Sequence, residues 1–576
     1  MNEYAKNIFI EQPNRFFVRS MVITERQAQV FHFDRSGVQH SPLFNIHDKP
    51  ETLVRLILGL LTSQERMLGL DDTIQWTASP DGTKTRGFVR TVGPNAVATT
   101  YELITSEDPI VRSNLLGRGT TCWAANSDGG EKLIIKDYWI VDSPADRRPS
   151  EFSLLEEVEG LPGVCQMISY EDNRAQTRDF RGDTSSFPQG VFLNRRNIRI
   201  VMKAHGPLIE SFTSIEQLLG ALRDAIAAHK ALVTRNIIHR DISPNNILLR
   251  EGGTKEGPRG IIIDLDHALR TTGPASEVCV DFKTGTRMFQ SAMVLKSCEM
   301  FPEYIPLYDY LDDLEAFFWV LVYIIISYRP NGDRMPRTGF QDRTMRGWSQ
   351  EGPGIAHDCK RSFLIFSSTV YAMRKTMDPG WQVIYDDLFL GFRTFVRDIT
   401  DEKDSLLYTS CTELPDGTLA PSRFEPILAR IDDHYNRVLA LFDVALEKIA
   451  TCSPTIAPGP SNPPTQPAFT PAPLSTNSGH ASDSPSVATS TTTVEEAILV
   501  EKTSTSPLDT KSVCASSSSS HAANLSTPHP RPKRRSKEAE LDDELSKDPK
   551  RRCPPSRRQF REILGPVYQF CRALLE

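Results

Sequence analysis

The chain has 576 residues, which is more than one ordinary domain needs, so we expect two or three domains. Its formal net charge of −7 argues against direct nucleic-acid binding by the chain as a whole. The ten cysteines contain no CxxC pair and indicate neither a zinc site nor a disulfide framework, so we expect a reducing, intracellular location.

The sequence also predicts no membrane association. The N-terminus shows no signal peptide, because a basic segment followed by an apolar core is missing there. The longest apolar stretch, residues 317–328, is too short to cross a bilayer and is better interpreted as a buried helix.

Residues 1–105 are predicted to form an α/β extension. Strand-forming runs lie on both sides of a turn sequence at residues 34–37, and leucines over residues 51–67 predict a helix packed on that sheet. Short strands separated by Gly- and Pro-containing turns follow over residues 74–105. This segment contains no group of catalytic residues, and we interpret it as structural or regulatory.

The middle of the chain changes from strand-rich to helix-rich sequence. Residues 106–205 favour strands, whereas residues 206–450 favour helices. Apolar residues recur at helical spacing over residues 213–233, and residues 312–328 are almost wholly apolar after their first turn. This order predicts a small β-rich lobe followed by a larger helical lobe.

The C-terminal part differs sharply in composition. Residues 451–530 are rich in Ser, Thr and Pro and predict a disordered linker. Residues 531–576 form a basic tail with a short helix, and its clusters near Arg534 and Arg551 predict binding to a nuclear-import receptor. The alternative is a solvated charge run that offsets neighbouring acidic residues. We therefore expect the nucleus or the cytoplasm as the location.

The residues with the clearest chemistry lie between His239 and Asp264. Asp241 lies five residues before Asn246, and Asp264 follows an apolar run that predicts a buried strand. Phosphoryl transfer uses an acid that orients the attacking hydroxyl, together with amide and carboxylate ligands for Mg²⁺. The combination is far more specific than an isolated HxD motif, and it predicts a phosphotransferase.

Three further elements complete such a site. Gly117 and Gly119 form a GxG loop whose backbone N–H groups can approach phosphates. Lys136 ends the apolar run of residues 133–135 about twenty residues later. Glu151, at the start of a predicted helix, is the best acidic partner for Lys136 because Leu155 then faces the core.

Together these residues resemble the eukaryotic protein-kinase superfamily, and more closely the fungal-type protein kinase family. Residues 239–246 match the catalytic-loop pattern H-R-D-x-x-x-x-N, and residues 264–266 match the D-F-G element. Residues 33–37, 285–291 and 312–315 support the narrower match. The resemblance implies a two-lobed α+β kinase fold and transfer of the γ-phosphoryl group of Mg-ATP to Ser or Thr hydroxyls of protein substrates.

The resemblance also implies a role for each candidate residue. Asp241 would be the catalytic base, and Asn246 and Asp264 the Mg²⁺ ligands. The ATP-binding residues would be Gly117, Gly119, Lys136, Glu151 and, at the adenine-binding hinge, Met202 and Ala204. The aspartate that Asp313 matches opens a buried helix in kinases and hydrogen-bonds the catalytic-loop backbone.

Four departures from the kinase pattern mark a divergent member. Ser243 replaces a lysine that helps to neutralise the transferred phosphoryl group. The loss of that positive charge would lower the rate by about 100-fold if nothing compensates. Asp266 replaces a small glycine, Cys122 replaces a loop glycine, and no A-P-E sequence follows the activation segment.

Two alternatives remain open at this stage. A small-molecule kinase of the aminoglycoside- or choline-kinase type shares the HxD, Asn and downstream Asp, but Arg240 and the start of the helix at Asp312 favour a protein kinase. A pseudokinase scaffold would bind partners without catalysis. The argument against it is that the catalytic set is intact, namely Lys136, Asp241, Asn246 and Asp264.

Overall fold

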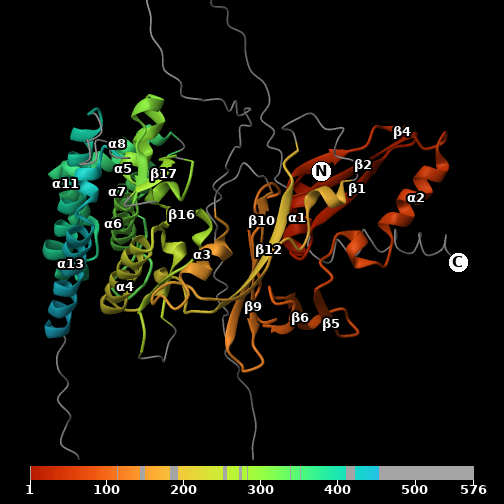
Figure 1. Cartoon of the computed structure of the whole chain (residues 1–576), viewed down its shortest axis with the longest axis horizontal. Helices are drawn as coiled ribbons and strands as arrows, with labels where there is room; N and C mark the ends of the chain where they lie inside the picture. Colours follow the sequence, from red (N-terminus) through yellow and green to blue (C-terminus); the bar gives the residue numbers. More distant parts are fainter. Residues whose placement is uncertain are drawn as a thin grey trace, which may run out of the picture. The chain divides into compact units, whose positions relative to one another are not determined.

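The structure is a computed structural model in which the described helices and strands belong to one compact unit, Met1–Pro464. The described residues are 2–112, 114–142, 149–181, 192–250, 256–271, 275–281, 283–337, 339–350, 352–409 and 422–452. The predicted basic tail, and all but the first two residues of the predicted linker, lie outside them. Strands dominate the first part of the chain and helices the later part, which confirms the predicted α+β class (Figure 1).

The chain begins with a helix that the sequence analysis did not predict. Helix α1, Asn2–Glu11, buries Ala5 and Phe9 against Val18 and Phe33 of the sheet that follows. That sheet is antiparallel, with β1, β2 and β3 in chain order and β4 paired with β2. Its strands are β1 (Phe17–Ile23), β2 (Gln27–Asp34), β3 (Gly37–His40) and β4 (Phe44–Asn45).

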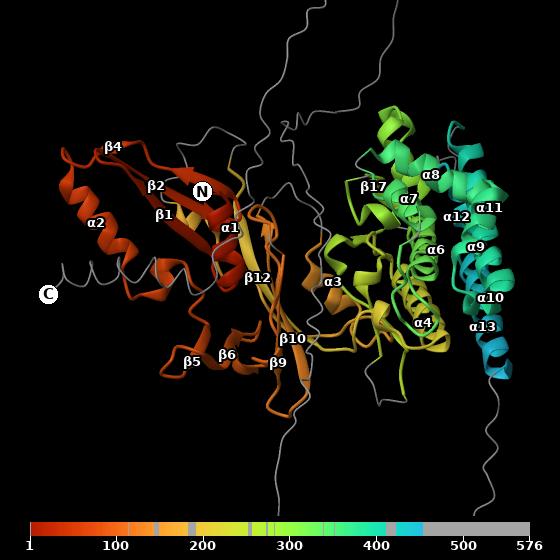
Figure 2. The ribbon, with the colours of Figure 1, turned by 180° about the vertical axis from the view of Figure 1, so that it is seen from behind.

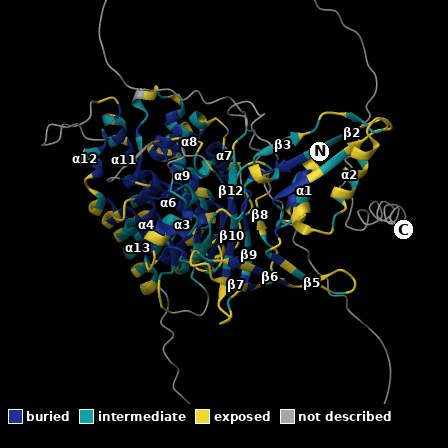
Figure 3. Cartoon of the chain, turned by 45° about the vertical axis from the view of Figure 1, so that its right-hand side comes forward, coloured by how far each residue is buried: buried dark blue, intermediate teal, exposed yellow. Residues whose placement is uncertain are grey.

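The helix expected over residues 51–67 is shorter than predicted and does not pack as predicted. Helix α2, Pro50–Leu60, buries none of its residues, and Val54 and Leu58 are 54% and 50% exposed (Figure 3). Its apolar residues are only one or two positions apart at several places and therefore face different sides of the helix. A 3₁₀ turn, Glu65–Leu68, takes the place of the last predicted turns.

A second sheet of eight strands spans the boundary at residue 105. Its order is β11-β12-β10-β9-β7-β6-β5, with β8 paired to β9, and all its pairs are antiparallel. The strands are β5 (Ile74–Ala78), β6 (Lys84–Val92), β7 (Ala98–Leu103), β8 (Ile110–Val111), β9 (Thr121–Asn126), β10 (Lys132–Val141), β11 (Met167–Glu171) and β12 (Arg195–Lys203). The expected extension and the expected small lobe therefore share this sheet.

One short helix lies between this sheet and the helical lobe. Helix α3, Glu151–Glu157, buries Glu151, Leu154 and Leu155 and contacts β11. Figure 2 shows α3 beside β10 and β12, on the side that faces the helices. The buried position of Glu151 in its first turn brings an acidic group to the inner face of the sheet.

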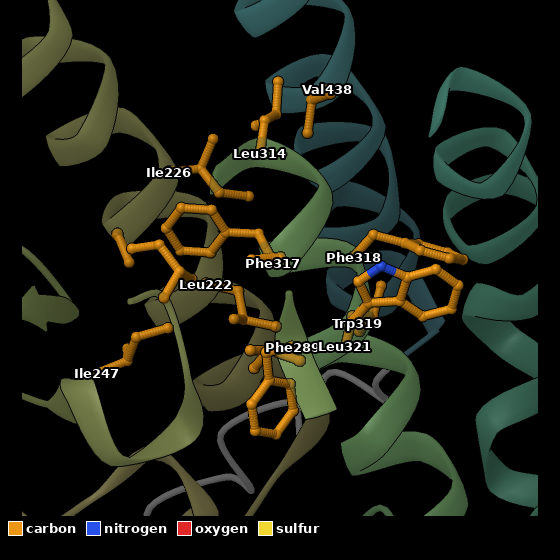
Figure 4. Close-up of a cluster of buried hydrophobic side chains, with 14 of the residues drawn as sticks. Leu222, Ile226, Ile247, Phe289, Leu314, Phe317, Phe318, Trp319, Leu321 and Val438 are labelled. Carbon is orange, nitrogen blue, oxygen red and sulfur yellow. The ribbon is translucent and has the colours of Figure 1, made fainter. Parts of the chain in front are cut away.

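The helical lobe is built around α6, Tyr310–Ser327, in which nearly every residue is buried. The side chain of Asp309 accepts a hydrogen bond from the backbone N–H of Leu311, and Asp309 and Asp312 form a capping box that fixes the helix start. In Figure 4, Phe317 lies beside Leu222 and Ile226 of α4 (Ile215–Thr234). A helix that is apolar on all sides belongs at the centre of its lobe, and both helices predicted here are confirmed.

The remaining elements surround α6 or connect it to the sheet. The other helices are α5 (Ala292–Lys296), α7 (Gly339–Trp348), α8 (Pro353–Ile365), α9 (Ser367–Thr376), α10 (Gln382–Ile384), α11 (Leu390–Leu406), α12 (Glu425–Leu428) and α13 (Ile431–Cys452). Short strands pair as β13 (Ile237–Ile238) with β16 (Leu269–Arg270), β14 (Ile247–Leu249) with β15 (Gly260–Ile262), and β17 (Ala275–Cys279) with β18 (Leu307–Asp309). Within the described ranges, no helix has both the length and the apolar character needed to cross a membrane.

Candidate active site

The loop between β13 and β14 is held in place by Asp313, which is buried in the first turn of α6. Its carboxylate accepts hydrogen bonds from the backbone N–H groups of His239 at 2.9 Å and Arg240 at 3.0 Å. Arg240 has a positive φ of 68°, a strained conformation that surrounding contacts must stabilise. The structure thus gives Asp313 the role that the kinase resemblance implied.

Asp241 lies in this loop between an amide and a hydroxyl group. Asn246 donates its side-chain N–H to the backbone oxygen of Asp241 at 2.8 Å and to its Oδ2 at 3.1 Å. Thr286 donates both its backbone N–H and its hydroxyl to Oδ1, each at 2.8 Å. The carboxylate is therefore oriented from two sides, and one of its neighbours is an aliphatic hydroxyl.

Asp264 follows β15 and adopts a left-handed conformation with a φ of 66°. The backbone N–H of the preceding Ile263 donates to the backbone oxygen of Asn246 at 3.1 Å, so Asn246 and Asp264 lie on adjoining segments. Lys136 donates to Asp264 Oδ1 at 2.7 Å. Burial would raise the pKa of Asp264, but the charge and hydrogen bond of Lys136 hold that pKa below its ordinary value.

Lys136 and Glu151 form the predicted ion pair. The lysine projects from β10 and its Nζ lies 2.8 and 2.7 Å from the two carboxylate oxygens of Glu151, with both side chains buried. Burial works against the charge of Lys136, but Asp264, Asp266 and Glu151 outweigh it and raise its pKa well above the ordinary value. A charged lysine held by two carboxylates suits an anion-binding role.

Cys122 does not lie in the glycine-rich loop. It belongs to β9, directly opposite Lys136 in the sheet register. Burial raises the pKa of its thiol to about 12, so the group stays neutral beside the ion pair. The position expected to carry the third loop glycine is therefore a strand position.

The glycine-rich loop connects β8 and β9, and both of its glycines have positive φ values, 106° at Gly117 and 52° at Gly119. Arg35, in the turn after β2, lies directly against Gly119. A Cβ atom at Gly119 would be 2.2 Å from Arg35 Nε. Arg35 is buried, donates to the backbone oxygen of Asn114 at 2.7 Å and lies over the ring of Phe9. Burial lowers its pKa to about 10.

The turn at residues 34–37 is therefore a brace for the loop. Gly117 donates its backbone N–H to the backbone oxygen of Arg35 at 3.2 Å. The turn is itself anchored, because Asp34 pairs with Arg181 at 2.5 Å and Ser36 donates to the backbone oxygen of Leu193 at 2.6 Å. The sequence predicted the turn itself and used its residues for the family match, but it did not predict their contact with the loop.

Because Arg35 lies against Gly119, we expect an alanine substitution there to destabilise the fold more than one at an unhindered glycine. Gly119→Ala is expected to lower the free energy of unfolding by about 1–3 kcal/mol more than Gly130→Ala, because the new methyl group clashes with the buried side chain of Arg35, which is held by its hydrogen bond to Asn114. Gly130 is the matched control: it too has a positive φ, 80°, but no atom lies within 4 Å of a Cβ there. Urea unfolding of the two variants measures the difference. Equal losses would mean that Arg35 moves aside.

Asp266 and Arg118 form a contact that the sequence analysis missed. Asp266 lies in the 3₁₀ turn Leu265–His267, and its Oδ2 is 2.5 Å from Arg118 Nη1 and 3.4 Å from Lys136 Nζ. The position expected to carry a small glycine therefore has an ionic partner in the glycine-rich loop. Ser243, in the lysine position, is buried, and its hydroxyl has no hydrogen-bond partner among the described residues.

The predicted hinge residues lie at the end of β12. Met202 pairs with Ile134 of β10, and the backbone N–H of Ala204 donates to the backbone oxygen of Lys132 at 3.1 Å. Paired residues share a face of the sheet, so Met202 is on the same face as Lys136, two positions along β10. Their described hydrogen bonds join them to the β10 backbone rather than to the side chains of Lys136 or Glu151.

The residues present fit a divalent cation and a phosphate chain. Ligand oxygens of Glu151, Asp264 and Asp266 lie within 4.8 Å of one another. Asn246 uses its side-chain N–H to hold Asp241, which leaves its carbonyl oxygen as the available ligand atom. Oxygen ligands of this kind suit Mg²⁺.

Comparison with known proteins adds one match. A family model described as fungal protein kinase matches residues 1–186 and 172–325, which together make up more than half of the chain. The chain matches no curated protein. The matched residues include the brace, the glycine-rich loop, the loop of Asp241 and Asn246, and Asp264.

Proposed function

Because the chain belongs to the fungal protein kinase family, we propose that it transfers the γ-phosphoryl group of Mg-ATP to serine and threonine hydroxyls of proteins. Membership of the family makes it a protein kinase and implies the use of ATP. The choice of acceptor, the metal and the role of each residue are the parts that we propose from the geometry.

One observation supports the proposal most strongly. The hydrogen bond from Ile263 N–H to the backbone oxygen of Asn246, 3.1 Å, joins the loop of Asp241 to the segment that ends in Asp264. A base, an amide ligand and a carboxylate ligand therefore meet at one place, with Lys136 bound to the last of them at 2.7 Å. Phosphoryl transfer depends on such positioning and on charge neutralisation.

Each of these side chains has a distinct task in the proposed reaction. Asp241 orients the acceptor hydroxyl and accepts its proton. Lys136, held by Glu151, binds oxygens of the α- and β-phosphates. Asn246 and Asp264 would hold Mg²⁺, which when bound offsets the charge of the phosphates.

The surroundings of Asp241 support an aliphatic alcohol as the acceptor. The hydroxyl of Thr286 already lies 2.8 Å from Asp241 Oδ1, within the reach that a general base needs. A serine or threonine side chain of a substrate is chemically the same group. Peptide libraries that differ only in Ser, Thr or Tyr at the acceptor position test this choice directly.

The central experiment compares the parent protein with Asp264→Ala in a kinase assay with labelled ATP. The variant is expected to lose at least about 100-fold in kcat, because it removes a ligand for the cation and a partner of Lys136. Asp333→Ala, at an exposed site, is the control and is expected to keep the parent rate.

The same assay separates the alternatives. A panel of peptides and small alcohols identifies a small-molecule kinase if only the alcohols are phosphorylated. A protein that binds Mg-ATP in a thermal-shift experiment but labels nothing in the panel is a scaffold, and that result would overturn the proposal.

A further inference from the structure

Arg118 occupies the tip of the glycine-rich loop, between Gly117 and Gly119, and its position is fixed at both ends. Its backbone oxygen accepts a hydrogen bond from the N–H of Trp139 in β10 at 2.8 Å. Its side chain reaches Asp266, with 2.5 Å between Nη1 and Oδ2 and 3.1 Å from Nη2 to the backbone oxygen. The loop therefore presents a cation directly over the segment that holds Asp264.

Carboxylates and cations surround this contact on several sides. Three carboxylates, those of Glu151, Asp264 and Asp266, lie together. Among the described residues, three cations meet them: Lys136 lies within 3.4 Å of all three carboxylates, Arg118 pairs with Asp266, and Arg112 pairs with Asp264 at 3.4 Å. A phosphate chain that enters here needs a cation, and Arg118, whose side chain is only 24% exposed, already lies beside these carboxylates.

With Ser243, the site lacks one positive charge that a lysine would supply at this position. Most protein kinases have a lysine at this position, whereas the buried Ser243 hydroxyl, which is compatible with the fungal-type pattern, carries no charge. A guanidinium group binds phosphate oxygens through two parallel hydrogen bonds, which makes arginine a strong substitute for the missing cation.

We propose that Arg118 is a phosphate-binding residue of the nucleotide site, which exchanges the carboxylate of Asp266 for phosphate oxygens when the nucleotide binds. The inference rests on the proposed function and names a residue that compensates for Ser243. Asp266 keeps the guanidinium in place before the nucleotide arrives, and the brace around Arg35 limits the movement of the loop. Such preorganisation reduces the entropy lost on binding.

The test measures the binding of two ligands, Mg-ATP and adenosine, by isothermal titration calorimetry. Arg118→Gln is expected to weaken Mg-ATP binding by about 10- to 100-fold, the value of a hydrogen-bonded charged partner. Adenosine has no phosphates, so its affinity is expected to stay at the parent value. Arg118→Lys keeps the charge and should recover part of the loss. Arg86→Gln, which breaks an exposed pair with Glu102 on the same sheet, is the control for both ligands.

A second variant separates phosphate binding from a purely structural ion pair. Asp266→Asn frees Arg118 from its competing carboxylate, but it also removes a candidate cation ligand. This variant is therefore titrated with ATP in Mg²⁺-free buffer, where binding is expected to remain at least as tight as in the parent. If the pair only supports the fold, Arg118→Gln and Asp266→Asn should weaken both ligands to the same extent, and the inference would be overturned. If Arg118→Gln binds Mg-ATP as tightly as the parent, this inference is overturned but the proposed function is not. A parent protein that binds no Mg-ATP would overturn the proposed function as well.

Discussion

Asp241→Asn is expected to lower kcat by about 100- to 10,000-fold, the usual contribution of a general base. Asparagine keeps the size of the side chain and an oxygen that can accept from Thr286, but it cannot take up the proton of the acceptor hydroxyl. The affinity for Mg-ATP should change little, because within the described part of the chain no hydrogen bond or ion pair joins Asp241 to Lys136 or Asp264. Steady-state kinetics with the best peptide of the panel, together with calorimetric titration of Mg-ATP, measure both quantities.

The kinetic result is informative only if the variant is folded. Thermal unfolding should therefore show Asp241→Asn close to the parent protein, since its backbone contacts are unchanged. Autophosphorylation as strong as that of the parent would show that another group accepts the proton. In that case the assignment of Asp241 as the base is wrong.

The sequence predicted the parts of the site that depend on local spacing. Asp241 and Asn246 lie in one short loop, and Asp264 ends the hairpin that follows, so their proximity follows from residue spacing. The Lys136–Glu151 pair could also be anticipated, because a charge at the inner face of a sheet needs a buried partner. The structure brings these two residues together.

The contacts that the sequence did not predict join segments far apart in the chain. Arg35 and Gly119 are separated by more than eighty residues, and Arg118 and Asp266 by nearly one hundred and fifty. No periodicity or local motif encodes such pairs. For Asp266, the departure from the glycine of the kinase pattern was the one available signal, and it indicated an altered site without identifying Arg118.

The pairing of strands across the expected domain boundary at residue 105 was likewise not predicted from the sequence. The strands before and after it were both predicted, but which strands are neighbours depends on the three-dimensional pairing of β7 with β9. In the structure, Leu103 pairs with Ala125 across that boundary, and both are buried in one cluster. The extension is thus physically continuous with the sheet that carries Lys136.

The second large effect is expected at Asp313, through stability. Its carboxylate accepts hydrogen bonds from the backbone of His239 and Arg240 and from the side chains of Tyr308 and His229, all of them buried. Asp313→Ala would leave these donors without an acceptor, and we expect the free energy of unfolding to fall by about 3–5 kcal/mol. That is a large part of the roughly 5–15 kcal/mol that stabilises a typical protein.

Urea unfolding at pH 7 measures this loss, with the exposed Asp333→Ala as the control, for which a change within about 0.5 kcal/mol is expected. Asp313→Asn keeps one acceptor oxygen and should lose less than the alanine variant. A loss in Asp313→Ala no larger than in the control would show that water or a rearranged loop satisfies the donors.

The pH dependence provides an independent check on the same carboxylate. Burial would raise the pKa of Asp313, but the hydrogen bond and charge of His229 bring it below the ordinary value. A carboxyl group with a lowered pKa in the folded state contributes stability above its unfolded-state pKa, and this contribution is lost as the pH falls through the folded-state pKa. The stability difference between the parent and Asp313→Ala should therefore be largest near neutral pH and shrink below about pH 4. Because the same carboxylate positions the backbone on either side of Asp241, the parent should lose its active-site geometry over the range in which this difference shrinks.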